Sequence, residues 1–383
     1  MTRRKNQIMK IAVNTRLLLK GRLEGIGWYT FETMKRIVKN HPEHTFYFLF
    51  DRAYDSSFVF EKNVVPVVLH PQARHPILFW IWFEISVFSF LKKNDIDLFL
   101  SPDGYLSLRT KTPSIAVIHD LNFEHYPLDL PWLVRKYYRY FFPRFAKKAS
   151  RIVTVSEFSK KDIHEQYGID SAKIDVSLNG MNADFRVCEL AEVESTKQKF
   201  SDGQDYFLFI GSLHPRKNLV NMFKAFDLFR KNNRTDIKLL IVGEKKWWTK
   251  EIATAYAEMA FKEEVLFLGR LSPEDLCRAL SASLALVYVS YFEGFGIPII
   301  EAYQCGTAVI TSKVTSMPEV AGDAALLVDP FSVPDIASAM EKMAFDSLLR
   351  ADLIAKGKNR KNMFSWDITA EKLWEGVEKE MSL

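Results

Sequence analysis

The sequence predicts an α/β protein with two domains, each built on a parallel β-sheet. Along most of the chain, short apolar runs alternate with helical patterns, as expected for parallel strands joined by helical crossovers. This alternation breaks once, after the turn signal Asn179-Gly180, and then restarts. The 383 residues suffice for two domains of about 150 residues each and a short tail. We therefore expect two Rossmann-like domains facing a cleft, at residues 1–185 and 186–365, and a C-terminal helix at 366–383 that returns to the first domain.

The first domain is expected to alternate strands with helices from its first apolar run onward. Apolar runs predict strands at Lys10–Asn14, Thr45–Phe50, Val64–Leu69, Leu98–Ser101, Ser114–His119, Arg151–Ser156 and Ile174–Ser177. Helical patterns cover Gly27–Lys39, Ile77–Leu91, Pro131–Ser150 and Glu157–Tyr167. The apolar segment Ile77–Leu91 contains Glu84 and is shorter than the ~20 residues that a membrane span needs, so we expect a buried helix.

The second domain repeats the alternation and carries glycines where strands end. Strands are predicted at Tyr206–Ile210, Ile237–Val242, Val265–Leu268, Leu284–Val289 and Ala308–Ile310, with helices at Asn218–Arg230 and near Pro298. The first three strands are each followed by a glycine, namely Gly211, Gly243 and Gly269. Such strand-to-helix turns build phosphate sites in doubly wound sheets. The tail from about residue 347 is helical in pattern.

Composition places the chain among ordinary globular proteins, with 48% hydrophobic and 26% charged residues. The net charge of +5 is compatible with anionic partners and says nothing about the fold. Cys188, Cys277 and Cys305 form neither a disulfide framework nor a metal-binding spacing, which favours the reducing cytoplasm. The basic start meets polar residues at Asn14 too soon for a secretion signal.

Two glutamates around a glycine-rich turn are the most specific signal. The segment reads Glu293-Gly294-Phe295-Gly296-Ile297-Pro298-Ile299-Ile300-Glu301. Proline suits the first turn of a helix, and glycines permit a close backbone approach to a ligand. We therefore place Glu293 in the loop after a strand and Glu301 in the first helical turn, where a carboxylate can accept both hydroxyls of a vicinal diol and N–H groups can face a phosphate. Alternatively, Glu301 only complements the helix dipole.

A basic loop at Gly211-Ser212-Leu213-His214-Pro215-Arg216-Lys217-Asn218 follows a strand and opens a helix. Arg216 offers a fork of donors and Lys217 a compact charge, which together can neutralise a pyrophosphate. In the first domain, His119 ends an apolar strand at the edge where ligands bind, although a lone histidine is more often structural. Gly25 and Gly27 lack the third glycine of a dinucleotide fingerprint and are equally explained as the start of a helix.

Together these motifs resemble family-4 retaining glycosyltransferases of the glycosyltransferase-B fold, over nearly the whole chain. The resemblance implies that Glu293 contacts the donor sugar, that Glu301 holds the nucleotide ribose, and that the backbone of Phe295 and Gly296 helps to hold sugar hydroxyls. It implies Lys217, aided by Arg216, on the donor phosphates. Many members carry arginine directly after Gly211, where this chain has Ser212. His119 would lie beside the donor sugar, and Gly25 and Gly27 in the glycine loop of the first domain. The resemblance also implies that the first domain, residues 1–185, is on the acceptor side and that the second, residues 186–365, binds the nucleotide-sugar donor.

The expected activity is therefore retaining hexosyl transfer from a nucleotide diphosphate sugar to a hydroxyl of a saccharide or lipid-linked acceptor. The variant Pro-Arg-Lys-Asn looks most like bacterial mannosyltransferases of surface polysaccharide synthesis, which suggests GDP-mannose, with a UDP-sugar as the alternative. No carboxylate nucleophile is evident, so a leaving phosphate oxygen is expected to take the acceptor proton, as the resemblance implies. Two other hypotheses are a catalytically silent nucleotide-sugar-binding subunit and a nicotinamide oxidoreductase, and the broken fingerprint disfavours the latter.

No catalytic metal and no cofactor beyond the nucleotide-sugar co-substrate are expected. Asp95-Ile96-Asp97 has the Asp-x-Asp pattern of metal-dependent glycosyltransferases of another fold, but it precedes a strand instead of following one. We interpret it as a solvated turn at the far edge of the sheet.

The segment Arg135–Arg151 carries seven basic residues interleaved with aromatic ones and no acidic residue. Two interpretations stand side by side: peripheral contact with an anionic membrane surface on the cytoplasmic side, or a helix packed on the sheet with its charges in water. The modest net charge and the absence of an RNA-binding motif argue against nucleic acid as a partner.

Overall fold

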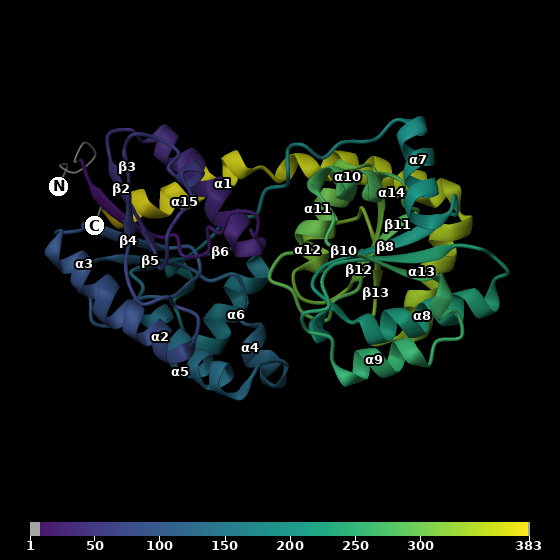
Figure 1. The fold of residues 1–383 in the computed structure, drawn as a ribbon, viewed down its shortest axis with the longest axis horizontal. Coiled ribbons are helices and arrows are strands. Elements are labelled where there is room, and N and C mark those ends of the chain that lie inside the picture. The colour runs from purple at the N-terminus through teal and green to yellow at the C-terminus, as the bar shows by residue number, and fades with distance from the viewer. Residues whose placement is uncertain (1–7, 382–383) are drawn as a thin grey trace. The chain divides into compact units, whose positions relative to one another are not determined.

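Contacts divide the chain into two units in the computed structural model, which describes residues 8–381 (Figure 1). Unit 1 holds Met1–Gly180 together with Ser365–Leu383, and unit 2 holds Met181–Phe364. The division falls at 180/181, whereas the sequence placed it at 185/186. Both units are built on all-parallel sheets covered by helices, so the predicted fold class is confirmed.

Unit 1 contains a seven-stranded sheet in the order β3-β2-β1-β4-β5-β6-β7. Its strands are β1 (Lys10–Asn14), β2 (Thr45–Phe50), β3 (Val64–Val68), β4 (Leu98–Ser101), β5 (Ser114–Val117), β6 (Arg151–Thr154) and β7 (Ile174–Val176). Central strands are buried on both faces, which explains their continuous apolar sequences. The strand order reverses between β1 and β4, and ligands of doubly wound sheets bind beside such a reversal, at the carboxyl ends of the strands.

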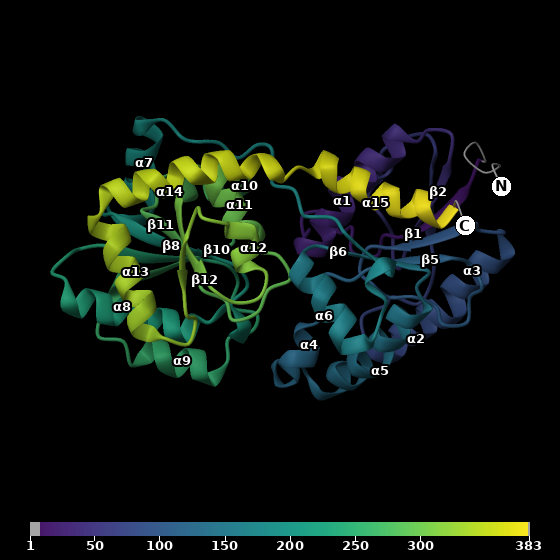
Figure 2. The same cartoon turned by 180° about the vertical axis from the view of Figure 1, so that it is seen from behind.

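Helices cover both faces of this sheet (Figures 1 and 2). On one face lie α1 (Gly25–Asn40) and the last helix, α15 (Trp366–Met381), which pack against each other. The other face carries the segment from α2 (Pro76–Ile81) to α3 (Phe88–Lys93), followed by α4 (Asn122–His125), α5 (Trp132–Lys148) and α6 (Glu157–Tyr167). Aromatic side chains from these helices fill the core beneath them, including Phe83, Phe142 and Phe145.

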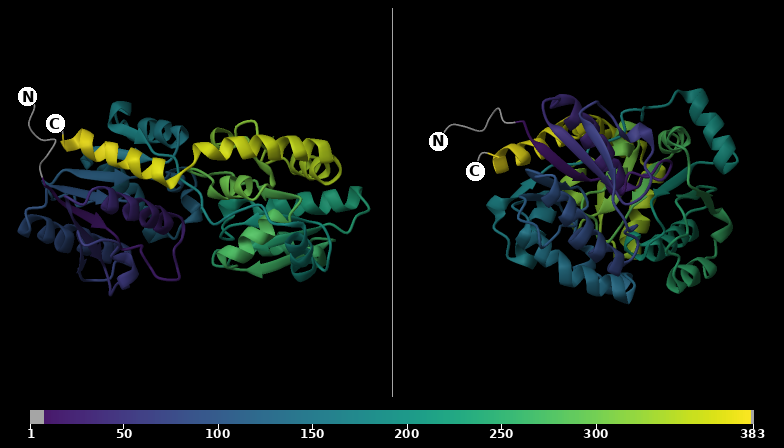
Figure 3. Two further views of the ribbon diagram at one scale, coloured as in Figure 1. Left: turned by 90° about the horizontal axis from the view of Figure 1, so that it is seen from above. Right: turned by 60° about the vertical axis from the view of Figure 1, so that its left-hand side comes forward.

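The last helix is fixed to unit 1 by backbone and side-chain contacts at its start. Ser177 Oγ donates to the Thr369 carbonyl at 2.9 Å, and Thr369 Oγ1 donates to the Leu178 carbonyl at 2.6 Å. A Cβ on Gly180 would lie 2.3 Å from the backbone nitrogen of Trp366, so only glycine fits there. Trp366 also contacts the ring of Tyr29, which is on α1. The C-terminal segment therefore completes unit 1, and Figure 3 shows it lying beside α1.

The apolar segment Ile77–Leu91 is a helix, but the expectation of burial holds for one face only. Ile77 is 61% and Ile85 is 47% exposed, whereas Trp82 and Phe83 are fully buried. A π-helical turn at Trp82–Val87 brings Glu84 inward, where its carboxylate accepts hydrogen bonds from the backbone of Leu108 at 2.8 Å and of Arg109 at 3.2 Å. Among residues 8–381, no helix combines the length and apolar character needed to cross a membrane.

Unit 2 contains a six-stranded sheet in the order β10-β9-β8-β11-β12-β13. Its strands are β8 (Tyr206–Ile210), β9 (Lys238–Val242), β10 (Val265–Gly269), β11 (Ala285–Tyr288), β12 (Ala308–Ser312) and β13 (Leu326–Val328). One face is covered by α8 (Leu219–Asn232), α9 (Lys250–Ala257) and α13 (Val333–Phe345), and the other by α7 (Leu190–Ser201), α10 (Pro273–Ser281), α11 (Ile297–Gln304) and α12 (Met317–Ala321). Helix α14 (Ser347–Arg360) packs against α11.

Several elements of unit 2 were not placed from the sequence, namely helices α7, α9, α10, α12 and α13 and strand β13. Helix α7 lies in the segment where no strong periodicity was found, and its buried residues are the polar Thr196 and Ser201, which apolar periodicity cannot detect. A capping box between Glu189 and Glu192 begins this helix. Strand β13 has three residues and pairs with one strand, so it is too short to show an apolar pattern in the sequence.

Candidate functional site

The carboxyl edge of the unit 2 sheet gathers the predicted basic loop and the first predicted glutamate. The loop follows β8 and Glu293 follows β11, and the strand order reverses between these two strands. Their loops are joined by a hydrogen bond from Tyr291 N to the Arg216 carbonyl at 3.0 Å. The predicted motifs therefore meet where a doubly wound sheet binds its ligands.

Glycines after β8 and β9 allow these turns to approach each other. Gly211 has φ +152° and Gly243 has φ +151°, values that side chains disfavour. A Cβ on Gly243 would lie 1.9 Å from the Gly211 carbonyl oxygen, so this contact requires glycine. A Cβ on Gly211 would lie 3.5 Å from Lys217 Cε, which shows that the lysine stem runs beside this turn.

Arg216, Lys217 and Glu293 form one buried charged cluster with Tyr288. Lys217 Nζ lies 2.5 Å from Glu293 Oε1 and donates to Tyr288 Oη at 2.6 Å. Arg216 Nη1 donates to the other carboxylate oxygen of Glu293 and to the Phe292 carbonyl at 3.2 Å. Lys217 is 7% and Glu293 is 6% exposed. Two cations thus share one carboxylate, which leaves the cluster with a net positive charge.

The neighbouring cations keep the Glu293 carboxylate ionised inside the cluster. Burial alone raises the pKa of Glu293, but the charges of Arg216 and Lys217 outweigh it and lower the pKa to about 2. Burial, followed by the nearby carboxylate of Glu293, raises the pKa of the Tyr288 hydroxyl, which stays protonated. At neutral pH the cluster therefore presents two cations, one carboxylate and a neutral phenol.

Glu301 lies in the second turn of α11, not in the first as the sequence suggested. The helix begins at Ile297 because Gly296, with φ +114°, serves as its N-cap. The Glu301 side chain is partly buried and has no hydrogen-bond or ion-pair partner among residues 8–381. Burial raises its pKa to about 8. A carboxyl group kept without a partner at this cost is a common feature of binding sites.

The turn before α11 offers backbone groups to a ligand. Ser316 Oγ lies 2.9 Å from the carbonyl oxygens of both Glu293 and Phe295, which fixes the shape of the turn. The N–H groups of Phe295 and Gly296 have no partner among the described residues. Such N–H groups can donate to a ligand oxygen, and the role of the Phe295 and Gly296 backbone in holding sugar hydroxyls stays a prediction.

Ser212 is exposed on the basic loop, with its carbonyl accepting from His214 N at 2.8 Å. Asn218, the last residue of the loop, has φ +63° and donates through its side chain to the carbonyls of Val289 at 2.9 Å and Pro330 at 2.7 Å. Asn218 therefore holds the loop in place, a role that its position in the motif did not indicate.

His119 lies after β5 in unit 1, at the carboxyl edge of that sheet. Its Nε2 donates to the Pro102 carbonyl at 2.8 Å, so Nδ1 is left as an acceptor without a partner among residues 8–381. Burial lowers the pKa of His119 more than the Pro102 hydrogen bond and the carboxylates of Asp120 and Asp103 raise it. The edge of the Tyr29 ring packs on the imidazole, with centroids 4.9 Å apart. The structure thus holds a neutral, oriented imidazole.

Gly25 and Gly27 are in the first turn of α1, so the expected glycine loop is a helix start here. A Cβ on Gly27 would lie 2.9 Å from the Leu17 carbonyl oxygen, which explains that glycine by packing. A Cβ on Gly25 would meet nothing within 4 Å. Packing therefore does not require Gly25, and it stays a candidate for ligand contact.

Further polar residues line the carboxyl edge of unit 1 and were not singled out in the sequence. Arg16 Nε lies 2.7 Å from Asp103 Oδ2, and Asn14 Nδ2 donates to Asp103 Oδ1 at 2.7 Å. Arg16 also stacks over the ring of Tyr105, 4.5 Å from its centroid. Asn14 is the last residue of β1 and Arg16 follows it, whereas Asp103 follows β4; these are the two strands beside the reversal. Applying the carboxyl-edge rule to these strands would have found them.

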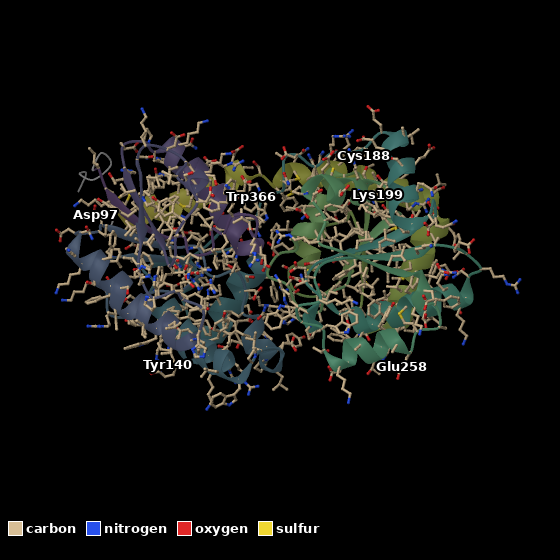
Figure 4. All side chains as sticks on the ribbon, viewed as in Figure 1. Asp97, Tyr140, Cys188, Lys199, Glu258 and Trp366 are labelled. Carbon is tan, nitrogen blue, oxygen red and sulfur yellow. The ribbon has the colours of Figure 1, made fainter. Side chains whose placement is uncertain are left out.

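Asp95 and Asp97 are exposed and lie at the opposite, amino edge of the unit 1 sheet. Asp97 Oδ2 accepts from the backbone of Lys10, where β1 begins, at 2.8 Å, and Figure 4 shows it at the outer end of the unit. Their position agrees with the interpretation as a turn. Among residues 8–381, no group of three or more histidine, cysteine and acidic side chains has an arrangement suited to a metal ion.

The basic segment Arg135–Arg151 combines features of both of its interpretations. Tyr137, Phe142 and Phe145 are buried in the core, whereas Tyr140 is 54% exposed and lies at the surface of unit 1 (Figure 4). The segment itself contains no acidic residue, but acidic partners come from other parts of unit 1. Tertiary contacts pair Arg139 with Glu124 at 3.1 Å and Arg151 with Asp175 at 2.9 Å.

A groove of about 1100 Å³ runs between α2 and α5 in unit 1. Leu128, on the loop before α5, is 84% exposed beside it, and Trp80 is 42% exposed. Basic side chains line it as well, namely Arg135, Lys136 and Arg139. An apolar groove with a basic lining is complementary to an amphiphile with an anionic head group.

We expect Glu301→Gln to stabilise the protein increasingly as the pH rises. The folded protein holds the Glu301 proton up to about pH 8, whereas the unfolded chain releases it near its ordinary pKa of 4.5. The free energy of unfolding that this proton contributes is thus lost between these values. In urea titrations from about pH 5 to about pH 9, the free energy of unfolding of the variant should exceed that of the unsubstituted protein by a growing amount. The difference should reach a few kcal/mol and level off above about pH 8.

The matched control is Glu293→Gln, at a carboxylate whose pKa is lowered to about 2. This carboxyl group is ionised in both the folded and the unfolded protein from about pH 6 upward. The substitution should therefore lower the free energy of unfolding by an amount that does not change with pH. A pH-independent margin for Glu301→Gln would contradict our description of that carboxyl group.

Comparisons with known proteins identify both halves of the chain. Residues 23–185 match the model of Glycosyltransferase Family 4, and residues 191–360 match that of Glycosyl transferases group 1. O-antigen chain mannosyltransferase B of Escherichia coli is 30% identical over 276 residues, which are 70% of this chain and 71% of that protein. O-antigen chain mannosyltransferase RfbU of Salmonella typhimurium is 30% identical over 236 residues, 62% of this chain and 61% of that protein.

Among solved structures, Alr3699/HepE from Anabaena in complex with UDP and glucose has a TM-score of 0.75 at 16% identity, over 97% of this chain and 99% of that one. At this identity the likeness shows the fold. Sequence relatives and fold agree with the resemblance found in the motifs. The chain therefore belongs to the glycosyltransferases of the GT-B fold, with a Glycosyltransferase Family 4 half followed by a Glycosyl transferases group 1 half.

Proposed function

We propose that this glycosyltransferase moves a hexose, with retention of configuration, from a nucleotide diphosphate sugar to a saccharide or lipid-linked acceptor in cell-surface polysaccharide synthesis. The observation that carries the proposal is the cluster of Arg216, Lys217 and Glu293 at the strand reversal of unit 2. Beside the same turn, α11 carries the unpartnered carboxyl group of Glu301. A diphosphate, a sugar and a ribose diol each find a chemically suited group there.

Charge stabilisation would come mainly from Arg216 and Lys217. The departing nucleotide diphosphate gains negative charge, and fixed cations in a buried site stabilise such charge strongly because no solvent must reorganise. Glu293 holds both cations in position before the donor arrives. When the phosphates take over part of that role, Glu293 is free to accept a hydroxyl of the donor sugar, as the family resemblance implies.

Retention would follow without a protein nucleophile. Glu293 is fully engaged with two cations and has a pKa of about 2, which makes it a poor nucleophile. A leaving phosphate oxygen would take the acceptor proton on the same face of the sugar. His119, neutral and fixed by Pro102, would orient a hydroxyl of the donor sugar through Nδ1.

The donor proposal rests on the relatives. The two O-antigen chain enzymes are mannosyltransferases, which supports GDP-mannose as the donor. The complex of Alr3699/HepE with UDP and glucose keeps a UDP-sugar as the alternative. A catalytically silent subunit is a weaker hypothesis, because His119, Lys217 and Glu293 are all present and ordered into hydrogen bonds.

We place the enzyme in the cytoplasm, peripherally bound to the inner face of the membrane. The support is the groove between α2 and α5, with exposed Trp80 and Leu128 beside Arg135 and Lys136. Lys136 also lies over the ring of Trp132, 4.2 Å from its centroid, so charge and aromatic surface occur together. An amphiphilic lipid-linked acceptor would place its chain in the groove and its phosphate on the basic lining.

The donor should raise the melting temperature of the purified chain in the presence of EDTA, because positive charge at the phosphates comes from side chains and helix ends. Thermal shifts with GDP-mannose and UDP-sugars at matched concentrations identify it, since a true donor stabilises by mass action. Hydrolysis of that donor separates an enzyme from a silent subunit. Stabilisation and hydrolysis that vanish with EDTA and return with Mn²⁺ would contradict the proposal, as would stabilisation by NAD(H) alone.

The two glutamates should affect different parts of the donor. Glu301→Ala should weaken binding of the free nucleotide diphosphate by about 10- to 100-fold, the value of one charged hydrogen bond of roughly 1.5–3 kcal/mol. Glu293→Gln keeps the shape of the cluster, so it should spare that affinity and lower the rate of sugar transfer. Calorimetric titration with the nucleotide diphosphate and initial rates with the donor check both. Equal losses of nucleotide affinity would show that the roles are misassigned.

Binding to liposomes should require anionic lipid, weaken in high salt, and weaken further in the double variant Lys136→Glu with Lys147→Glu. Each basic residue near an anionic surface contributes about 1 kcal/mol, and both side chains are exposed on α5. Lys35→Glu with Lys39→Glu makes the same charge change on α1, which covers the other face of the sheet, and should bind normally. Co-sedimentation that ignores lipid charge, or that the two double variants reduce equally, would leave only the packed-helix interpretation.

A further inference from the structure

The three cysteines, which are far apart in the sequence, converge at one place in unit 2. Cys277 lies on α10, Cys305 directly follows α11, and Cys188 precedes α7 (Figure 4 labels Cys188). Cys305 Sγ lies 3.8 Å from Cys277 Sγ and points its hydrogen toward it. All three thiols are free. The folded chain thus holds a thiol pair that the spacing along the sequence does not reveal.

Cys277 is set up as the more reactive thiol of the pair. The S–H of Cys305 and the backbone N–H of Arg186, 3.3 Å away, donate to its sulfur. The hydrogen bond from Cys305 lowers the pKa of Cys277 most, and despite the opposing effect of burial the pKa falls to about 6. The same hydrogen bond and burial raise the pKa of Cys305. Within the pair, Cys277 is therefore the more acidic thiol and Cys305 the one that keeps its proton. As a thiol, Cys277 can also donate to the Arg186 carbonyl, 3.4 Å away.

A cavity of about 390 Å³ gives small molecules access to Cys277. It is lined by Cys188, Cys277, Arg186 and Arg278 among others. Hydrogen peroxide is close in size to water, which occupies about 30 Å³ in the liquid, so it fits easily. Cys305 has no exposed surface, and its sulfur lies 3.8 Å from that of Cys277.

We propose that Cys277 is an oxidation site whose sulfenic acid is captured by Cys305, and that the resulting disulfide displaces α11 with Glu301. In the first step the Cys277 thiolate attacks peroxide, the O–O bond breaks, and Cys277 sulfenic acid and hydroxide form. In the second step Cys305 sulfur attacks the sulfenic sulfur, the S–O bond breaks, and water leaves with the Cys305 proton. The two sulfurs lose two electrons in total, and the peroxide gains them.

The displacement follows from where Cys305 stands. A disulfide requires sulfurs about 2 Å apart, so the present separation must shrink by about 2 Å. Cys305 N donates to the Glu301 carbonyl at 3.0 Å in the last turn of α11, and this helix spans only Ile297–Gln304. A pull on Cys305 is therefore transmitted to Glu301. This second half of the proposal rests on the assignment of Glu301 to the nucleotide.

Formation of the disulfide is tested on the full chain. The protein is treated with hydrogen peroxide, alkylated without reduction, and analysed by intact mass and peptide mapping. We expect a loss of two hydrogen atoms and a cross-link between the Cys277 and Cys305 peptides, reversed by dithiothreitol. Cys188→Ser is the matched control and should form the same cross-link. Cys305→Ser should stop at the sulfenic acid of Cys277, which dimedone traps. A Cys188–Cys277 cross-link, or no loss of hydrogen, would overturn the assignment.

The coupling half is tested by titrating UDP and GDP into the reduced and the oxidised chain. We expect the nucleotide that binds the reduced chain to bind the oxidised chain about tenfold more weakly, comparable to the loss of one charged hydrogen bond, and dithiothreitol to restore it. Peroxide should leave the affinity of Cys305→Ser unchanged. A cross-linked chain with unchanged affinity would overturn the coupling. Failure of both nucleotides to bind the reduced chain would instead overturn the proposed function, while the mapped cross-link would stand.

Discussion

The buried ion pair between Lys217 and Glu293 is the constraint on which the rest of the unit 2 site depends. Taking two charges out of water costs several kcal/mol per ion, and only close contact with further hydrogen bonds offsets that cost. Tyr288 and Arg216 supply those bonds. The lysine stem runs beside the turn at Gly211, and the turn after β11 must bring Glu293 within hydrogen-bond distance.

The same ion pair bears on how the proposed site would exchange the contacts of its cations for contacts with a ligand. Arg216 and Lys217 share the carboxylate of Glu293, so these three charges sum to one positive charge at the edge of the sheet. An incoming diphosphate relieves that imbalance, whereas a neutral ligand does not. Glu301 is the opposite case, a carboxyl group without a partner among residues 8–381, whose pKa is raised by burial. Under the proposed function, both positions would give up stability in favour of binding.

The charges at the carboxyl edge of unit 1 are paired differently. There Arg16 and Asp103 neutralise each other, Asn14 completes the hydrogen bonding, and aromatic rings surround the guanidinium. This edge carries no excess positive charge from the pair, and His119 beside it is neutral. Such chemistry suits the recognition of hydroxyl groups better than of phosphate.

The sequence by itself determined the α/β class, most strands of both sheets and the residues of the main charged cluster. Strand periodicity and the glycines that end β8, β9 and β10 are local signals, so tertiary structure did not have to be known to read them. Glu293 and the basic loop were identifiable because each follows a strand, and Glu301 because a glycine-rich turn and a proline open its helix. The sequence also predicted that the last helix returns to the first domain, and the contacts of Trp366 and Thr369 place it there.

Only the tertiary structure decided which of these groups pair and what charge each carries. The clustering of Cys188, Cys277 and Cys305 and the partners of Arg139 and Arg151 depend on contacts between segments many residues apart. Helix α7 escaped detection because it buries polar side chains, and Glu301 was misplaced by one turn because Gly296 begins the helix earlier. Burial and distance set pKa values and pairing, and neither is encoded in any short stretch of sequence.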